Sequence, residues 1–150
     1  MKIIEIRNTI SQEEAQSLYE VFSEAFHKPP SSSFLQRLNE KQNLSVLIAK
    51  EGNKVVGFKI GYQRFQGIFF SWLGAVAKEH QQKGIARKLS RTQHQNCLER
   101  GFQEIQTEAA GNNSAMLILN LKEKFEVYGT HLGYQNDLTV QLRKSLKEIS

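Results

Sequence analysis

A glycine surrounded by positive charge is the feature of this chain best suited to chemistry. The segment HQQKGIARKLSRTQ, at residues 80–93, contains no acidic residue. Four basic side chains flank Gly84 within it: Lys83, Arg87, Lys88 and Arg91. The first amides of a helix lack intrahelical acceptors and carry partial positive charge, and a glycine there lets an anion approach the backbone closely. We therefore expect residues 81–86 to hold an anion such as a pyrophosphate.

Two common phosphate-binding loops do not match this segment. A P-loop requires G-x-x-x-x-G-K-[ST], and a dinucleotide-binding turn requires G-x-G-x-x-G, whereas only Gly84 is present here. Taken alone, the pattern fits an ordinary basic first turn of a surface helix equally well. The elements around the turn must decide between the two interpretations.

Apolar periodicity predicts the order β-α-α-β-β-β-α-β-α-β-β around this turn. An S-x-x-E capping box at Ser11–Glu14 predicts the first helix, which Pro29 and Pro30 end. The segment GIFFSWLGAVA precedes the turn as a strand, and Gly101 ends the helix that follows it. Residues 67–109 then form one strand–helix–strand unit whose strands are parallel and joined by a right-handed crossover.

The fold class expected from this order is α+β, as a three-layer α/β arrangement. It contains a mixed, mostly antiparallel sheet of six to seven strands with helices on both faces. A chain of 150 residues fits a single core, so we expect one domain over residues 1–150.

The stretch GAVAKEHQQKGIARKL resembles the first cofactor motif of the GNAT superfamily of N-acetyltransferases. That motif is a strand ending in Val, a short loop, and Q/R-x-x-G-x-G/A opening a helix. Val76, Gln81, Gly84 and Ala86 occupy these positions. Asn113, followed twelve positions later by Phe125, is similar to the second motif. The element order also matches, so the resemblance covers essentially the whole chain and implies the GNAT acyl-CoA N-acyltransferase fold.

Four positions depart from the family pattern. Lys78 stands where a Pro is usual, and Glu123 and Lys124 stand where Leu-Gly is usual. Many members carry a Tyr that is proposed to protonate the leaving thiolate, and this chain has Asn120 there. Because an amide cannot act as a general acid, another group must supply that proton or the thiolate leaves unassisted.

The resemblance implies an acyltransferase with acetyl-CoA as co-substrate and an amine as acceptor. It places the pyrophosphate on the amides of residues 82–86, the pantetheine beside the strand at 74–76, and the asparagines of the second motif on the other side. The cofactor-binding residues so implied are Gly74, Ala75, Val76, Gln81, Gln82, Lys83, Gly84, Ile85, Ala86, Arg87, Asn113 and Asn120.

An acceptor amine must lose a proton before it attacks, since a free alkyl amine has a pKa of about 10. Glu108, at the end of the strand after the crossover, is the catalytic base that we predict, against the alternative of a solvated strand-end carboxylate. Glu24 is a weaker candidate. We expect His94 on a helix surface, His80 in a solvated turn, and Cys97 as a small buried apolar residue.

The composition limits the other functions. The formal charge of +5 is modest for a nucleic-acid binder, and the aromatic residues fall on apolar stripes, so no nucleic-acid partner is expected. One cysteine, no recognisable signal peptide and no bilayer-length apolar run indicate a cytoplasmic protein with no membrane partner. No metal-ligand spacing occurs. The acceptor, a small molecule or a peptide, and homodimer formation are left open, as is a non-catalytic acyl-CoA sensor or scaffold.

Overall fold

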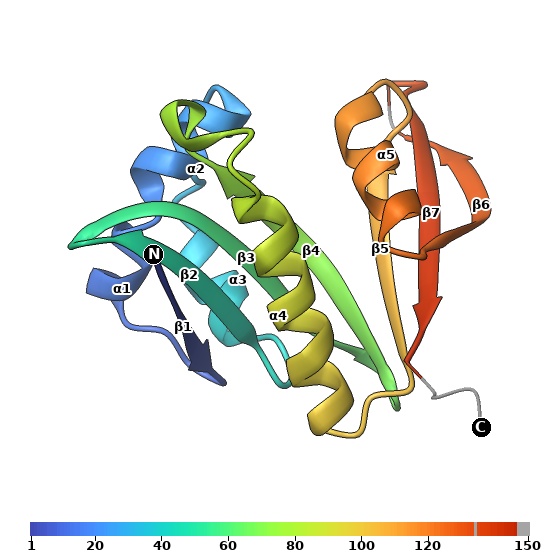
Figure 1. Cartoon of the computed structure of the whole chain (residues 1–150), viewed down its shortest axis with the longest axis horizontal. Coiled ribbons are helices and arrows are strands. Elements are labelled where there is room, and N and C mark those ends of the chain that lie inside the picture. The colour runs from blue at the N-terminus through green and yellow to red at the C-terminus, as the bar shows by residue number, and fades with distance from the viewer. Residues whose placement is uncertain (134, 147–150) are drawn as a thin grey trace.

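The computed structural model of the chain describes residues 1–133 and 135–146 (Figure 1). Seven strands form one sheet in the order β1-β2-β3-β4-β5-β7-β6. Their bounds are β1 Lys2–Arg7, β2 Ser45–Glu51, β3 Lys54–Phe65, β4 Ile68–Val76, β5 Glu104–Ala110, β6 Glu126–Leu132 and β7 Leu138–Ser145. Of the pairings within the sheet, β4–β5 is parallel and the others are antiparallel. The expected fold class, with its single strand–helix–strand crossover, is confirmed.

The helices agree with the sequence except at one break. Their bounds are α1 Gln12–Gln16, α2 Tyr19–Phe26, α3 Phe34–Asn39, the 3-10 turn η1 Lys78–His80, α4 Ile85–Glu99 and α5 Ser114–Lys122. Ser11 and Glu14 form the expected capping box. The first helix, expected to be continuous, divides after Ser17, whose Oγ donates 2.6 Å to the carbonyl of Glu14 and whose position caps α1. A serine hydroxyl that competes for a backbone carbonyl favours such a break.

Helices cover both faces of the sheet. On one face, α1 to α3 pack through Phe22 and Phe34 against Phe58 of β3. On the other, α4 packs through Ile85 and Leu89 against the β2 and β3 strands. A third cluster lies under α5 and includes Phe69, Ile105, Phe125 and Leu142. Figure 1 shows α4 over β3 and β4, and α5 over β5 and β7.

The parallel strands β4 and β5 separate soon after they meet. They pair from Ile68–Glu104 to Ser71–Thr107, and at the last pair the Thr107 hydroxyl donates 2.8 Å to the carbonyl of Ser71. Beyond it, β4 remains paired with β3 as far as Val76, and β5 remains paired with β7 as far as Ala110. The two strands therefore enclose an opening whose facing backbone edges are unpaired in the described sheet (Figure 1).

Close packing of β3 against Phe69 gives a stability prediction. A Cβ on Gly61 would lie 2.6 Å from Cζ of the fully buried Phe69 and 2.7 Å from the carbonyl oxygen of Phe70. We expect Gly61→Ala to lower the free energy of unfolding by about 1–3 kcal/mol, because the core must shift to admit it. Gly74→Ala is the matched control, since its Cβ would approach no described atom closer than 3.4 Å. Equal urea midpoints for the two variants would contradict the prediction.

Candidate functional site

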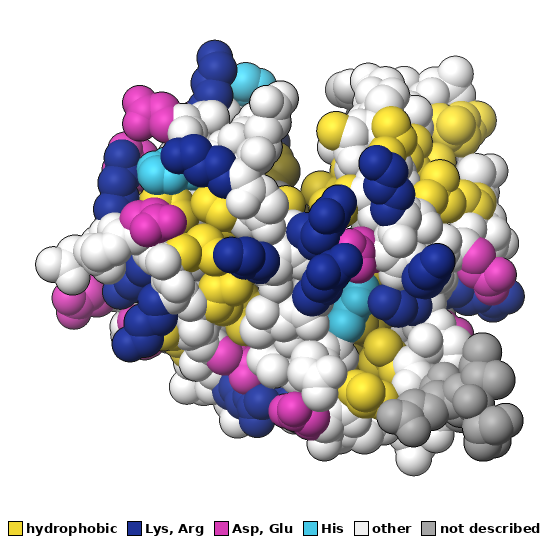
Figure 2. Space-filling model, viewed as in Figure 1, with side chains coloured by type: hydrophobic (Ala, Val, Ile, Leu, Met, Phe, Trp, Pro, Cys, Tyr) yellow, Lys and Arg dark blue, Asp and Glu magenta, His cyan; other side chains and the backbone are white. Residues whose placement is uncertain are grey.

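A cavity of about 730 Å³ lies at the opening between β4 and β5. In Figure 2 it corresponds to the hollow between the two lobes, with Lys and Arg side chains gathered over α4 and near α5. The lining comes from β3, the end of β4, the following turn, α4, α5 and one residue of α2. These residues are Ala25, Phe58, Lys59, Gly74, Ala75, Val76, His80, Gln81, Gln82, Gly84, Ile85, Ala86, Arg87, Leu89, Asn113, Ala115, Met116 and Leu119.

Most of the predicted cofactor residues meet in this cavity. The strand residues Gly74 to Val76, the turn residues Gln81, Gln82 and Gly84, the helix residues Ile85 to Arg87, and Asn113 all line it. Lys83 is exposed in the turn and Asn120 is buried within α5, and neither is part of the lining. The structure thus assembles residues that lie up to 39 positions apart in the sequence, from 74 to 113.

The turn before α4 presents open backbone amides. Gly84 is the N-cap of α4 with a φ of +80°, and no side chain caps the helix there. Gln82 also has a positive φ, of +64°. No described atom outside its neighbours lies within 4 Å of where a Gly84 Cβ would stand, so the space above the turn is open. Backbone N–H groups in such a turn, at a helix N-terminus, form an anion-binding concavity.

Two side chains hold this turn in place. The Gln81 amide donates 3.2 Å to the carbonyl of Val76, and the Glu24 carboxylate accepts the backbone N–H of Lys78. Glu24, a weaker candidate for the base, therefore anchors the turn to α2. The opposite wall is fixed by Asn113, which caps α5 by accepting 3.2 Å from the N–H of Met116. Its Oδ1 is engaged in this cap, which leaves its NH₂ group to face a ligand.

The charge at the cavity mouth is partly compensated. Glu123, at the C-terminal end of α5, has a side chain only 10% exposed and lies 3.4 Å from Arg87 Nε and 3.4 Å from Arg91 Nε. Arg87 also lines the cavity. The departure from the family pattern at Glu123 thus creates an ion pair that joins α5 to α4 across the opening.

Lys59 is a cavity residue that sequence reasoning missed. It lies in β3, pairs in register with Gly74 of β4 and lines the cavity beside it. Burial lowers the pKa of Lys59 to about 8. No signal along β3 itself marked it, because the glycine that leaves space beside Lys59 is Gly74 on the neighbouring strand.

His94 is buried, so the expectation of a surface position was wrong. Lys144 Nζ lies 3.1 Å from its Nδ1, and Ser90 Oγ lies 3.3 Å from its Nε2. An ammonium group only donates, so Nδ1 is the acceptor and Nε2 carries the proton. Burial, followed by the charges of Lys144 and Lys59, lowers the pKa of His94 to about 3. The two polar atoms of the neighbouring buried Gln93 side chain have no hydrogen-bond partner in the described structure.

Glu108 lies at the beginning of the opening, one residue after the last β4–β5 pair. Alternation along β5 turns it away from the buried Thr107, toward the sheet face that carries Tyr62 and Trp72. Burial raises the pKa of Tyr62, and the charge of Glu108 adds to the rise. The Oε1 atom of Glu108 is 3.8 Å from His131 Nε2, and the Glu108 side chain is 27% exposed. Glu108 does not line the cavity itself, and its role as a base stays a prediction.

The remaining titratable candidates take structural positions. Cys97 is 2% exposed, and burial raises its pKa to about 12, so the expected apolar role is confirmed. His80 lies in η1 and lines the cavity, closer to a ligand than a solvated turn implies. No described helix has the length and apolar character of a membrane span.

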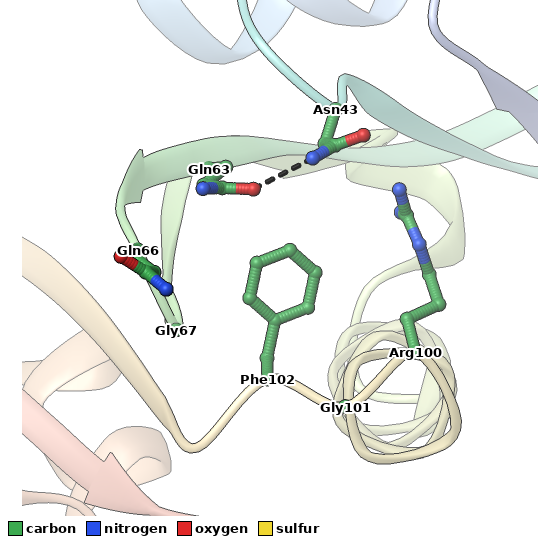
Figure 3. A pocket seen from close by; sticks show the side chains of 7 residues that line it. All are labelled: Asn43, Gln63, Gln66, Gly67, Arg100, Gly101 and Phe102. Carbon is green, nitrogen blue, oxygen red and sulfur yellow. Dashed lines mark hydrogen bonds between the residues drawn. The ribbon is translucent and has the colours of Figure 1, made fainter.

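A second hollow lies at the other end of α4 (Figure 3). Its lining consists of Asn43, Gln63, Gln66, Gly67, Arg100, Gly101 and Phe102. Asn43 donates 2.6 Å to Gln63, and Arg100 lies over the Phe102 ring at 5.6 Å. None of the predicted site residues is in its described lining, which leaves the opening between β4 and β5 as the candidate site.

Comparison with known proteins identifies the family of the chain. Residues 13–119 match the profile of the family described as "Acetyltransferase (GNAT) family". No curated protein matches the chain.

Solved structures share the fold at low sequence identity. The ribosomal-protein-S18-alanine N-acetyltransferase from Escherichia coli superposes with a TM-score of 0.81 at 16% identity, covering 98% of this chain and 97% of that one. Ard1 from Thermoplasma volcanium superposes with a TM-score of 0.82 at 14% identity, covering 99% of this chain and 100% of that one. An aminoglycoside 6'-N-acetyltransferase complexed with coenzyme A superposes with a TM-score of 0.81 at 12% identity, covering 100% of this chain and 99% of that one. At these identities, the likeness concerns the fold.

The buried histidine predicts a loss of stability in acid. Because the folded-state pKa of His94 is about 3 against an ordinary 6.5, the unfolded chain binds the extra proton between these values, so stability falls as the pH falls below 6.5. Between pH 7.5 and pH 5 we expect His94 to account for a loss of about 2 kcal/mol, at about 1.4 kcal/mol per pKa unit. Urea unfolding of His94→Gln should show a smaller pH dependence than wild type over this range. His27→Gln, at the exposed end of α2, is the control for the loss of a histidine away from the core.

Proposed function

This chain belongs to the GNAT acetyltransferase family and is an acyltransferase, and from that premise we propose that it transfers the acetyl group of acetyl-CoA to a primary amine by direct attack in a ternary complex. The observation that carries the proposal is the cavity at the opening between β4 and β5, with unpaired strand edges at one end and the open amides of the α4 turn at the other. An extended arm with an anionic end fits both features.

The phosphate end of the donor is assigned to the turn. The amides of residues 82–86 and the partial positive charge of α4 would hold the pyrophosphate, with Lys83, Arg87 or Lys88 meeting its oxygens. Arg87 must share its charge between the donor and Glu123. These cations act on affinity for the donor and leave the chemical step to groups deeper in the opening.

The thioester end is assigned to the edge of β4. An extended pantetheine arm would pair with the backbone of Gly74 to Val76 as an added strand does. A backbone N–H of the same edge would polarise the thioester carbonyl and stabilise the charge that develops on its oxygen. On the other side, the free NH₂ group of Asn113 would contact the arm.

The acceptor is assigned to the face opposite α4. Glu108 projects there from the beginning of the opening, so its carboxylate can take the proton of an incoming ammonium group directly or through water. The acceptor is a small molecule or a peptide with a free amine, and we propose a cytoplasmic setting in keeping with the single buried cysteine. Family membership favours this enzyme over the acyl-CoA sensor that Asn120 leaves open.

An amine panel tests the proposal. Purified protein is incubated with acetyl-CoA and amino acids, polyamines, aminoglycosides, lysine derivatives or peptides with free N-termini, and released CoA is measured. We expect at least one class of amine to raise CoA release far above the rate of hydrolysis. Tight CoA binding without turnover of any amine would favour the sensor.

Gly84 tests the donor site. We expect Gly84→Asp to weaken CoA binding more than tenfold, which is over about 1.4 kcal/mol, because it places a negative charge where the pyrophosphate would lie. Gly84→Asn is the matched control: it has nearly the same shape and tolerates the positive φ, but it is uncharged. Calorimetry should show a much smaller loss for Asn. If folded Gly84→Asp bound CoA with wild-type affinity, the pyrophosphate would not bind at this turn.

Glu108 tests the base. We expect Glu108→Gln to retain CoA affinity while acetylation slows by about 10²-fold or more, since the amide keeps the size but loses the basicity. The variant's rate should rise steeply with pH as neutral amine becomes available without help. Glu104→Gln, on the same face of β5, is the control and should behave as wild type. A pH profile of Glu108→Gln that coincides with wild type would show Glu108 to be a bystander.

A further inference from the structure

Lys59 lies beside the unpaired edge of β4. Its register partner across the β3–β4 pair is Gly74, and its Nζ is 3.8 Å from where a Cβ on Gly74 would stand. Because Gly74 has no side chain, the long Lys59 side chain crosses over β4 and reaches the cavity that both residues line. The ammonium group is therefore held next to the stretch of strand assigned to the pantetheine arm.

This ammonium group has no partner of its own. Within residues 1–133 and 135–146, no hydrogen bond or ion pair involves Lys59. Lys59 is partly buried and lines the cavity, where no protein group in the described residues competes for its protons. The titratable groups that share its cavity or interact with it electrostatically are His80 in η1 and Arg87 and His94 on α4, and none is a carboxylate. The protons of Lys59 are therefore available to water or to a ligand that enters the cavity.

We infer that Lys59 is the proton donor to the thiolate that leaves when the acetyl group is transferred, an inference that rests on the proposed function. The amine nitrogen bonds to the carbonyl carbon, the C–S bond breaks, and its electron pair stays on sulfur. A proton moves from Lys59 Nζ to that sulfur, giving the free thiol. The neutral Lys59 amine then regains a proton from water. The base passes the first proton of the ammonium group to water and then takes the surplus proton of the acetylated nitrogen.

The other cavity residues are poorer donors. Arg87 does not release a proton in proteins, and His80 lies in the turn, four residues beyond the end of β4. Asn120, at the family's usual donor position, is an amide that is absent from the described cavity lining. A Lys59 pKa of about 8 keeps the group largely protonated at pH 7. That pKa is also below that of an alkyl thiol, which exceeds the cysteine value of about 8.5, so proton transfer from Lys59 to the leaving thiolate is downhill.

Two substitutions separate the proton from the charge. Lys59→Met keeps the length of the side chain and removes its protons, whereas Lys59→Arg keeps the charge but cannot give up a proton. Lys54→Met, at the exposed beginning of the same strand, is the matched control. With acetyl-CoA and the most active amine of the panel, we expect both Lys59 variants to bind CoA within about threefold of wild type and to turn over about 10²-fold or more slowly. Wild-type turnover in Lys59→Arg would assign the effect to charge alone and overturn the inference.

The leaving group provides a readout that a structural role would not change. Wild type, Lys59→Met and Lys54→Met are compared with two donors. One is S-acetylpantetheine, whose alkyl thiol needs a proton to leave, and the other is S-acetyl-4-nitrothiophenol, whose thiolate leaves unaided. The Lys59→Met defect should persist with the first donor and shrink to less than tenfold with the second. Equal defects with both donors, or no defect with either, would overturn the role of Lys59. If Lys59→Met does not fold, wild-type protein alone is tested with acetyl donors of different thiol pKa. A wild-type rate that falls steeply as the thiol pKa rises would overturn the role of Lys59, because a protonated leaving group makes the rate depend only weakly on that pKa.

Measurements on the wild-type protein distinguish failure of the proposed function from failure of the role assigned to Lys59. Wild-type protein that binds no CoA, or acetylates no amine, would remove the proposed function and this inference with it. Wild-type protein that does both, beside an unimpaired Lys59→Met variant, would remove only the assignment of Lys59.

Discussion

The site depends on the early end of one strand pairing. The parallel strands β4 and β5 share only the register from Ile68–Glu104 to Ser71–Thr107, and each then continues with its outer neighbour alone. Because β3 and β7 hold the two strands from outside, they remain ordered while their inner edges are unpaired. Backbone N–H and C=O groups require partners, so an opening of this kind is suited to an extended ligand that supplies them. The placement of α4 and α5, one on each side, turns the opening into a cavity.

The sequence was informative wherever a local signal determined the structure. The capping box at Ser11 and the start of a helix at Gly84 are local, and both are present as expected. The crossover between β4 and β5 had to be parallel because a helix joins them, and it is. The break after Ser17 was missed, because apolar periodicity continues across it and only the side-chain bond to the Glu14 carbonyl interrupts the helix. That β4 and β5 separate toward Val76 and Ala109 was implied by the family resemblance alone, and the residue at which their pairing ends, Ser71–Thr107, has no local sequence signature.

Buried polar groups were the main omission in the site. Lys59, His94 and Gln93 are ordinary surface residues by type, and a single sequence read for hydrophobicity assigns them to solvent. His94 and Gln93 instead lie on the buried face of α4, and Lys59 lies on β3 beside the cavity; the Lys59 and His94 pKa values fall there, and Gln93 is left without a described partner. Gly74, which leaves space beside Lys59 on the neighbouring strand, becomes a sign of its position only once the β3–β4 register is known.

The ion pairs of Glu123 have a consequence for selectivity. Arg87 lines the cavity and already faces the Glu123 carboxylate, so an anion that arrives at Arg87 competes with that carboxylate rather than with water alone. A singly charged metabolite can do no more than match Glu123, whereas a phosphate ester carries nearly twice its charge and three acceptor oxygens. At this side chain we therefore expect selection by valence, with polyanions favoured over monoanions.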